Sequence, residues 1–297
     1  MEAVLHFFLW AVSRIPLSVL RRAGSFFGAV VYIVAPKYRH KILNNVDRVG
    51  LPKSVGYESS RHTGMLVAET GWLWGRSNEE IMQAVAFAPG VIETFSSALD
   101  SGKSVVLMTP HVGGFEAIPV AVFEAILKKR GKALSILYRE PKSRIIRPFV
   151  KHSRTRPGMD PAPADLSGVR KIVRAMRAGG VLGCLPDQVP GRGEGVLAPF
   201  FGQPAFTMTF PMKMARQFNA VCIVMTSERV ARGWTLDAQL LDYRAEGDAL
   251  SDATVMNAMI ERAVMKTPEQ YLWSYNRYKK AAHYVRHFAS KESDSCK

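Results

Sequence analysis

From residue 104 onward, short apolar runs alternate with stretches that have the hydrophobic periodicity of helices. The predicted strands are 104–109, 133–138, 181–185, 221–226 and 234–240, and the predicted helices are 115–129, 143–153, 166–178, 208–218 and 252–266. Alternation of this kind is typical of a mostly parallel central sheet flanked by helices. We therefore expect an α/β fold with a single domain over residues 37–290 and a polar tail over 291–297.

The residues before this pattern are expected to be mostly helical, and the first 36 are strongly apolar. Residues 3–12 contain only His6 as a polar side chain, and residues 23–36 contain only Ser25. Neither stretch reaches the roughly 18 to 20 uninterrupted apolar residues of a spanning helix. We expect residues 1–36 to form a membrane-associated helical segment, lying in one leaflet or dipping through it. The alternative is a helical hairpin packed on the protein's own core.

Two short motifs predict where helices begin. Ser77-Asn78-Glu79-Glu80 has the pattern of a capping box, in which the Ser and the second Glu bind each other's backbone N–H groups. Thr267-Pro268-Glu269-Gln270 predicts a last helix, with Thr267 as the cap and Pro268 in the first helical position.

Charge and cysteine content restrict the partners. The net charge of +15 in 297 residues indicates an anionic partner. Residues 128–156 hold eleven Lys and Arg and a single acid, Glu140. No helix-turn-helix, zinc or aromatic-interleaved RNA signature accompanies them, so a phosphorylated lipid or an acidic carrier protein is expected rather than nucleic acid; mere solubility is the alternative. The three cysteines, Cys184, Cys222 and Cys296, have no metal spacing, and the first two lie in apolar runs as inert thiols of a reducing compartment.

The strand over 104–109 leads directly into His111, Gly113, Gly114 and Glu116. On one straight helix, side chains five residues apart would point about 140° apart. His111 and Glu116 meet only if the histidine lies on the turn and Glu116 in the first turn of the next helix, a bend that the two glycines permit. A histidine held by a carboxylate is a candidate general base. The alternative is a structural histidine with a solvated glutamate.

A second polar pair follows the strand over 181–185. Asp187 and Gln188 lie at its carboxyl end, where open α/β sheets bind their ligands. We expect this strand end and that of His111 to converge on one crevice. Phe200 and Phe201 follow in an apolar segment and are expected to line a pocket or contact lipid. A covalent acyl-serine is disfavoured, because the chain has no G-x-S-x-G nucleophile elbow.

Taken together, these segments resemble the lipid A biosynthesis acyltransferases, the late (secondary) acyltransferases of bacterial endotoxin synthesis. The resemblance covers most of the chain and runs in the family's order. It rests on the apolar N-terminus and these blocks: Arg39-His40-Lys41-Ile42-Leu43-Asn44-Asn45, Gly64-Met65, Glu69-Thr70-Gly71, His111 to Glu116, Tyr138-Arg139, Arg154-Thr155-Arg156, Asp187-Gln188, Pro199-Phe200-Phe201-Gly202-Gln203-Pro204-Ala205 with Thr207, and Pro268-Glu269-Gln270-Tyr271-Leu272-Trp273. The chain departs from the family at Ser274-Tyr275-Asn276-Arg277-Tyr278-Lys279, where His, Arg and Phe are usual.

The resemblance implies a fold like that of the glycerol-3-phosphate acyltransferases and a place at the bacterial inner membrane, facing the cytoplasm. It implies an acyl–acyl carrier protein donor, an anionic glycolipid acceptor (a phosphorylated glucosamine lipid), and neither a metal nor an organic cofactor. The catalytic residues expected are His111 and Glu116. The substrate-binding residues expected are Arg139, Arg154, Arg156, Asp187, Gln188, Phe200 and Phe201.

In the mechanism that we expect, His111 removes the proton from a hydroxyl on an acyl chain of the acceptor, and the oxygen attacks the donor thioester directly. Glu116 fixes the tautomer of His111, and Arg154 or Arg156 either stabilises the oxyanion or binds an acceptor phosphate. The alternatives are the same reaction on another glycolipid, such as a mannosylated phosphoinositide, and a catalytically inactive protein that binds anionic membranes.

Overall fold

The computed structural model describes residues 2–138, 147, 150, 153, 155–191, 193–243 and 247–279, without the side chains of residues 2–6 and 8. The predicted helix over 143–153 lies almost wholly outside the described residues. Arg139, Arg154, Cys296 and the predicted polar tail lie outside them as well.

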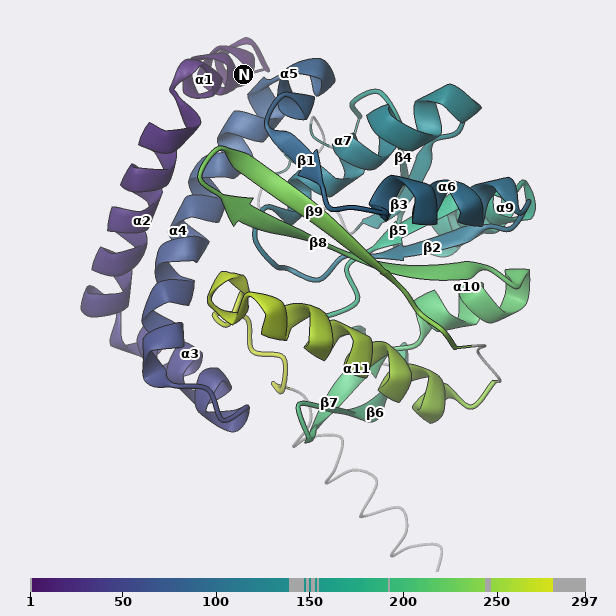
Figure 1. Cartoon of the computed structure of the whole chain (residues 1–297). Coiled ribbons are helices and arrows are strands. Elements are labelled where there is room, and N and C mark those ends of the chain that lie inside the picture. Colours follow the sequence, from purple (N-terminus) through teal and green to yellow (C-terminus); the bar gives the residue numbers. More distant parts are fainter. Residues whose placement is uncertain are drawn as a thin grey trace, which may run out of the picture.

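A sheet of seven strands forms the centre of the described chain (Figure 1). Its order is β1-β9-β8-β2-β5-β3-β4, and every neighbouring pair is parallel except β8 and β9. The strands are β1 (Val85–Phe87), β2 (Val105–Met108), β3 (Leu134–Tyr138), β4 (Met159–Pro163), β5 (Val181–Cys184), β8 (Val221–Val230) and β9 (Gly233–Leu240). The five predicted strands are all present, and the predicted α/β fold with a mostly parallel sheet is confirmed.

Helices cover both faces of the sheet, and the side chains of β2 alternate between the two cores that result. Val106 and Met108 lie in a core with α3 (Pro36–Arg48), α9 (Leu166–Arg177), α10 (Phe210–Phe218) and α11 (Ala249–Lys266). Val105 and Leu107 lie in a core with the end of α4 (Lys53–Gly75), α5 (Asn78–Met82), α6 (Val91–Asp100) and α7 (Ile118–Val122). A strand with both faces covered is expected to read as the continuous apolar run that predicts β2.

The predicted helix over 115–129 is helical but irregular. A 3₁₀ turn, η1 (Phe115–Ala117), precedes α7, and the π-helical turn η2 (Phe123–Leu127) and the 3₁₀ turn η3 (Lys128–Arg130) follow it. The irregular first turn places Glu116 directly after the loop that carries His111.

Four strands lacked a sequence signal, for identifiable reasons. The edge strand β4 contains Pro161 and Pro163, which cannot donate to a ladder and are found at sheet edges. The separate hairpin of β6 (Gly195–Phe200) and β7 (Gln203–Met208) turns through Phe201 and Gly202, both with positive φ. Asn-Gly or Asp-Gly is usual at such a turn, so the Phe-Gly sequence does not predict a hairpin. The strand β1 has only three residues.

Of the two helix-start motifs, one is confirmed. The Ser77 and Glu80 side chains bind each other's backbone N–H groups at the start of α5. The expectation of a capped last helix at Thr267 is wrong: Pro268–Gln270 is a single 3₁₀ turn, η4, and Thr267 makes no side-chain cap. The Gln270 side chain binds the backbone of Arg229 instead of closing a capping box.

The apolar N-terminus forms two helices, α1 (Glu2–Arg14) and α2 (Leu17–Val34), and α2 lies along α4 (Figure 1). The backbones of α2 and α4 touch at glycines: a Cβ on Gly64 would lie 2.0 Å from the Gly24 oxygen, and one on Gly28 would lie 2.3 Å from the Ser60 oxygen. One side of α2 therefore packs on the protein, as the alternative of a packed helical hairpin expects. The outer side of α2 stays bare, however, with Phe26, Phe27, Ile33 and Val34 exposed. The helix α2 does not end at Arg21 and Arg22 but continues through them. By its length and composition alone, it is therefore long and apolar enough to cross a membrane.

Candidate active site

His111 and Asp187 come from the carboxyl ends of neighbouring strands. Parallel β2 and β5 pair with Met108 opposite Cys184, and each polar residue lies three positions beyond its strand. The His111 Nδ1 atom lies 2.8 Å from Asp187 Oδ1, and the His111 backbone N–H donates to Asp187 Oδ2 over 2.9 Å. The predicted convergence of the two strand ends is therefore confirmed.

The Asp187 carboxylate determines which ring nitrogen of His111 carries the proton. A carboxylate only accepts, so Nδ1 bears the hydrogen and Nε2 keeps its lone pair. The Gln188 amide nitrogen lies 3.1 Å from that Nε2 atom and donates to it. Asp187 thus orients the imidazole so that the Nε2 lone pair is available to accept a proton, as in a general base.

The sequence interpretation assigned the tautomer-fixing role to Glu116, and here the structure corrects it. Asp187 occupies the position at Nδ1, because its strand is the direct neighbour of the strand that carries His111. Glu116 lies, as expected, in the first helical turn after the glycines, where it is half-buried and lines a cavity with Gln188. The ring of Phe115 packs edge-on against His111, with 4.6 Å between the ring centroids.

The two glycines of this loop are required for different reasons. Gly113 has φ +56°, and a Cβ there would lie 1.9 Å from the Ser227 oxygen. A Cβ on Gly114 would lie 1.9 Å from the indole nitrogen of Trp234. Backbone bonds of Gly113 to Gln270 and of Gly114 to Ser227 then fix the loop on β8 and on η4.

Residues near the C-terminus also contact this pair, a role that the sequence interpretation did not assign to them. The Leu272 N–H donates to the His111 oxygen, and the Val189 N–H donates to the Tyr275 hydroxyl. Burial and the Asp187 carboxylate, which accepts a hydrogen bond from Tyr271, raise the pKa of Tyr271 well above its ordinary value. Tyr275 lies within the segment that departs from the family's usual residues, so this segment contributes to the site here.

Burial and His111 act in opposite directions on the pKa of Asp187. Burial raises it, but the charge of His111 and the hydrogen bonds from its ring and backbone outweigh burial, so the pKa lies below its ordinary value. Asp187 therefore stays ionised at neutral pH and stabilises positive charge on the imidazole.

A cavity of about 770 Å³ adjoins this pair. Its walls are mainly apolar and come from β2, β3, β5, α9 and α10, with Leu107, Ile136, Val169 and Phe210 among them. Gln188, which touches the imidazole, belongs to the same lining. The volume is in the range of about 300 to 1,000 Å³ that is usual for small-molecule sites, and the apolar walls suit an alkyl chain.

The structure places the other expected binding residues differently. Phe200 is 1% exposed and packs in the core against Tyr278, and Phe201 packs on Trp273. Neither belongs to the cavity lining, because the β6–β7 turn directs both rings toward α11 and the C-terminal segment. Arg156 donates to the backbone oxygens of Leu73 and Arg76 at the end of α4. Burial lowers the pKa of Arg156, and the charge of Glu116 opposes this effect.

The basic segment over 128–156 is partly used within the protein. Lys128 pairs with Glu124, Arg130 pairs with Asp100, and Lys132 donates to backbone oxygens at the end of α9. Within the described residues, no group of three or more His, Cys, Asp or Glu side chains is placed to hold a metal ion. Cys184 and Cys222 are buried free thiols, as expected.

Comparison with known proteins identifies the family of this chain. The sequence profile of the bacterial lipid A biosynthesis acyltransferases matches residues 3–280. The chain belongs to this family. It is therefore an acyltransferase of lipid A biosynthesis, and the resemblance inferred from the sequence blocks is confirmed.

Individual relatives are distant, and most of them align along nearly the whole chain. The lipid A biosynthesis lauroyltransferase of Escherichia coli K12 is 23% identical over 282 residues, which cover 91% of this chain and 89% of that protein. The palmitoleoyltransferase of the same organism is 25% identical over 284 residues, covering 91% and 88%. A lipid A biosynthesis acyltransferase of Haemophilus influenzae is 27% identical over 183 residues, which span 61% of this chain and 56% of that protein.

Proposed function

We propose that this acyltransferase moves a fatty acyl chain from acyl–acyl carrier protein to a hydroxyl of a lipid A precursor at the cytoplasmic face of the inner membrane. The observation that carries the proposal is the buried His111–Asp187 pair beside an apolar cavity. The fold that we propose is of the glycerol-3-phosphate acyltransferase type, with residues 37–290 as one catalytic domain and residues 1–36 as its membrane-associated part.

The reaction proceeds by direct attack. The acceptor hydroxyl replaces the Gln188 amide at His111 Nε2, which takes the proton as the oxygen attacks the thioester carbonyl. The carbon–sulfur bond breaks, the new ester forms, and the carrier's sulfur leaves with the proton from the imidazolium. Asp187 keeps His111 in the required tautomer and stabilises its charge. Glu116 and Gln188 position the substrates from the cavity wall.

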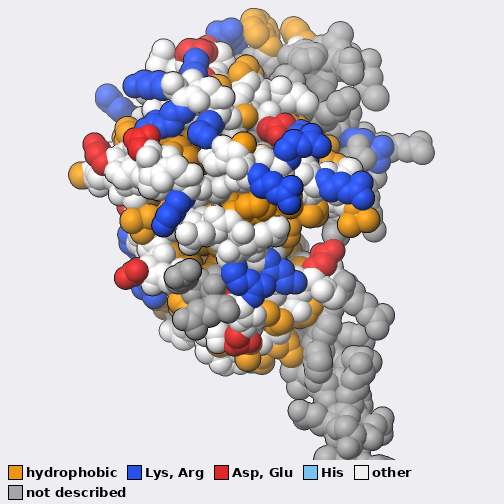
Figure 2. Space-filling view, turned by 90° about the vertical axis from the view of Figure 1, so that its right-hand side faces the viewer, with side chains coloured by type: hydrophobic (Ala, Val, Ile, Leu, Met, Phe, Trp, Pro, Cys, Tyr) orange, Lys and Arg blue, Asp and Glu red, His pale blue; other side chains and the backbone are white. Residues whose placement is uncertain are grey.

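The carrier protein binds on the face formed by α9 and α10. Five exposed cations lie there, without a carboxylate partner among the described residues: Arg170, Arg174, Arg177, Lys213 and Arg216. Figure 2, which faces the side of the molecule where α9 and α10 lie, shows Lys and Arg side chains around an exposed hydrophobic strip. Leu166, Val169 and Phe210 of the same helices line the cavity, so an acidic carrier bound there presents its acyl chain to the cavity.

The direct test is His111→Ala, assayed with acyl carrier protein thioesters and a lipid A precursor. Loss of a general base lowers turnover by roughly 10²- to 10⁴-fold. A matched control is Lys103→Ala, an exposed residue directly before β2 that we expect to leave turnover unchanged. Near-normal turnover of His111→Ala would exclude the base mechanism. Weighing the product from thioesters of mixed chain length also identifies the preferred acyl group.

A further inference from the structure

A second cavity lies between α2, α4 and the β8–β9 hairpin. Its volume is about 790 Å³. Four arginines line it (Arg21, Arg22, Arg61 and Arg229), and the lining contains neither Asp nor Glu. It shares no lining residue with the cavity beside His111. None of the residues to which the proposed acyl transfer assigns a role lines this second cavity.

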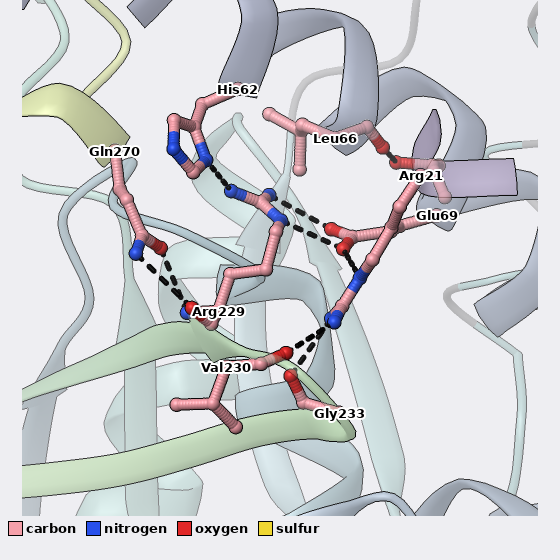
Figure 3. Close-up of polar contacts among 9 residues, drawn as sticks. Arg21, His62, Leu66, Glu69, Arg229, Val230, Gly233 and Gln270 are labelled. Atoms are coloured by element: carbon pink, nitrogen blue, oxygen red, sulfur yellow. Dashed lines mark hydrogen bonds and ion pairs between the residues drawn. The ribbon is translucent and has the colours of Figure 1, made fainter. Parts of the chain in front are cut away.

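A buried charge network forms the floor of this cavity. Glu69 of α4 is fully buried, and Figure 3 shows the guanidinium groups of Arg21 and Arg229 pointing toward it. Arg21 Nε lies 2.5 Å from Glu69 Oε1, and Arg229 Nε and Nη2 lie 2.7 and 2.8 Å from the two carboxylate oxygens. One carboxylate therefore serves two permanent cations, and the network keeps a net positive charge.

The rest of the lining adds to this positive charge. Arg61 pairs with Glu58, but Arg22 is exposed and has no acidic partner among the described residues. His62 Nδ1 accepts a hydrogen bond from Arg229 Nη1. Burial and the charges of Arg229, Arg61 and Arg21 lower the pKa of His62 to about 4, so it is neutral at physiological pH. Four guanidinium charges thus face only two carboxylates, and an anion is the ligand that such a cavity attracts.

The surroundings of the cavity indicate which anion. Phe26 lines the cavity and belongs at the same time to the bare apolar side of α2, together with Phe27, Ile33 and Val34. A ligand here meets arginines in the cavity and an exposed apolar helix surface beside it. A phosphate carried by a lipid combines both requirements, because its chains cover the helix while guanidinium groups bind the phosphate oxygens.

We propose that this arginine-lined cavity binds the phosphate group of an anionic membrane lipid, at a site separate from the one where acyl transfer occurs. The bound headgroup holds the protein at the bilayer surface through α2 and α4. This inference does not depend on the acyl-transfer proposal, since its test measures lipid binding alone.

The test is flotation of the purified full-length protein with vesicles of phosphatidylcholine alone or with added phosphatidylglycerol. The variant Arg22→Gln/Arg61→Gln removes two charges from the cavity. Each basic residue near an anionic surface contributes about fivefold to binding, so the preference for phosphatidylglycerol vesicles falls by about tenfold to thirtyfold. The control Lys103→Gln/Lys129→Gln removes two exposed charges outside this cavity and keeps the preference.

A second variant fills the cavity without changing the charge. Ser18 is exposed and lines the cavity, so Ser18→Trp obstructs it and leaves the buried network in place. We expect Ser18→Trp to lose the preference for phosphatidylglycerol while it still floats with phosphatidylcholine. An equal loss in the lysine control, or an unchanged preference in Ser18→Trp, would show general charge attraction and overturn the proposal. Binding of inorganic phosphate by the arginine cavity, without any vesicle preference, would also overturn the lipid assignment.

Discussion

Two of the carboxylates buried in the described part of the chain, Asp187 and Glu69, have opposite uses. Asp187 faces a histidine, a partner that can gain and lose a proton and whose second nitrogen contacts Gln188 on the wall of a cavity. Glu69 faces two arginines, which stay charged at every physiological pH. The first pair can take part in a reaction, whereas the second can only hold structure and charge in place. The partner, and not the buried acid itself, decides which role is possible.

The two clusters are also joined. The Gln270 backbone oxygen accepts the Gly113 N–H of the His111 loop, and its side-chain amide binds the Arg229 backbone in both directions. Figure 3 shows Gln270 beside Arg229 at one end of the network. Substitutions in the two clusters are nevertheless expected to act differently, on activity around His111 and on stability around Glu69.

Asp187→Asn is expected to give the largest effect and to act on activity. An amide at Nδ1 favours the wrong tautomer of His111, and in a comparable triad this change costs about 10⁴-fold in turnover. We expect a loss of about 10³- to 10⁴-fold, with the fold retained by circular dichroism. Glu116→Gln is the matched change on the cavity wall, and a larger loss there than at Asp187 would reverse the assigned roles.

Glu69→Gln is expected to act on stability. It leaves Arg21 and Arg229 buried without a full counter-charge, which costs about 3 to 5 kcal/mol in the free energy of unfolding. Glu58→Gln, on the exposed Arg61 pair of the same helix, costs about 0 to 1 kcal/mol. Chemical denaturation of both variants measures the difference, and equal costs would contradict a structural role for the buried network.

The arginine cluster should make stability depend on pH through His62. The pKa of His62 is about 4 in the folded protein against 6.5 in its ordinary state, so the unfolded chain binds more protons between these values. Stability therefore rises as pH rises from about 4 to 6.5, by at most about 3 kcal/mol. His62→Gln should remove this part of the slope in denaturation curves taken across that range. An unchanged slope would show that other groups produce it.

Tyr271→Phe should have the smallest effect. It removes one hydrogen bond to the Asp187 carboxylate and leaves the ring in place, which costs about 1.5 to 3 kcal/mol at most for a charged acceptor. We expect turnover to fall by roughly tenfold and its acid-side pH dependence to shift upward, because Asp187 is then easier to protonate. A change in stability with an unchanged pH profile would mean that Tyr271 only fills space.

The sequence predicts the His111–Asp187 cluster better than the cluster of Glu69, Arg21 and Arg229, for a physical reason. His111 and Asp187 each follow an apolar strand, and parallel strand ends meet at one sheet edge, so local patterns predicted their encounter. The choice between Glu116 and Asp187 as the partner of His111 depended on strand order, which local patterns do not specify. Glu69 and Arg229 lie 160 positions apart, on a helix and a strand, and nothing local relates them.

The remaining errors also arise from tertiary contacts. Phe200 was expected in a pocket because two adjacent phenylalanines are costly on a bare surface, but the β6–β7 hairpin buries it in the core instead. Gln270 was expected to close a capping box, but its side chain binds the backbone of Arg229 instead. Gly113 and Gly114 were correctly singled out, although Ser227 and Trp234, which exclude larger residues there, are far away in the sequence.

The glycine contact between α2 and α4 has a consequence for how the enzyme meets its substrates. At Gly24, Gly28 and Gly64 the backbones of α2 and α4 are in direct contact. The helix α2 is therefore packed rigidly on the rest of the protein and is not joined to it by a flexible linker alone. If α2 rests in lipid, as proposed, the depth and tilt of the whole enzyme are set by that contact. His111 then stays at one height above the bilayer, and a glycolipid whose hydroxyl lies at another height is excluded by position before any chemistry begins.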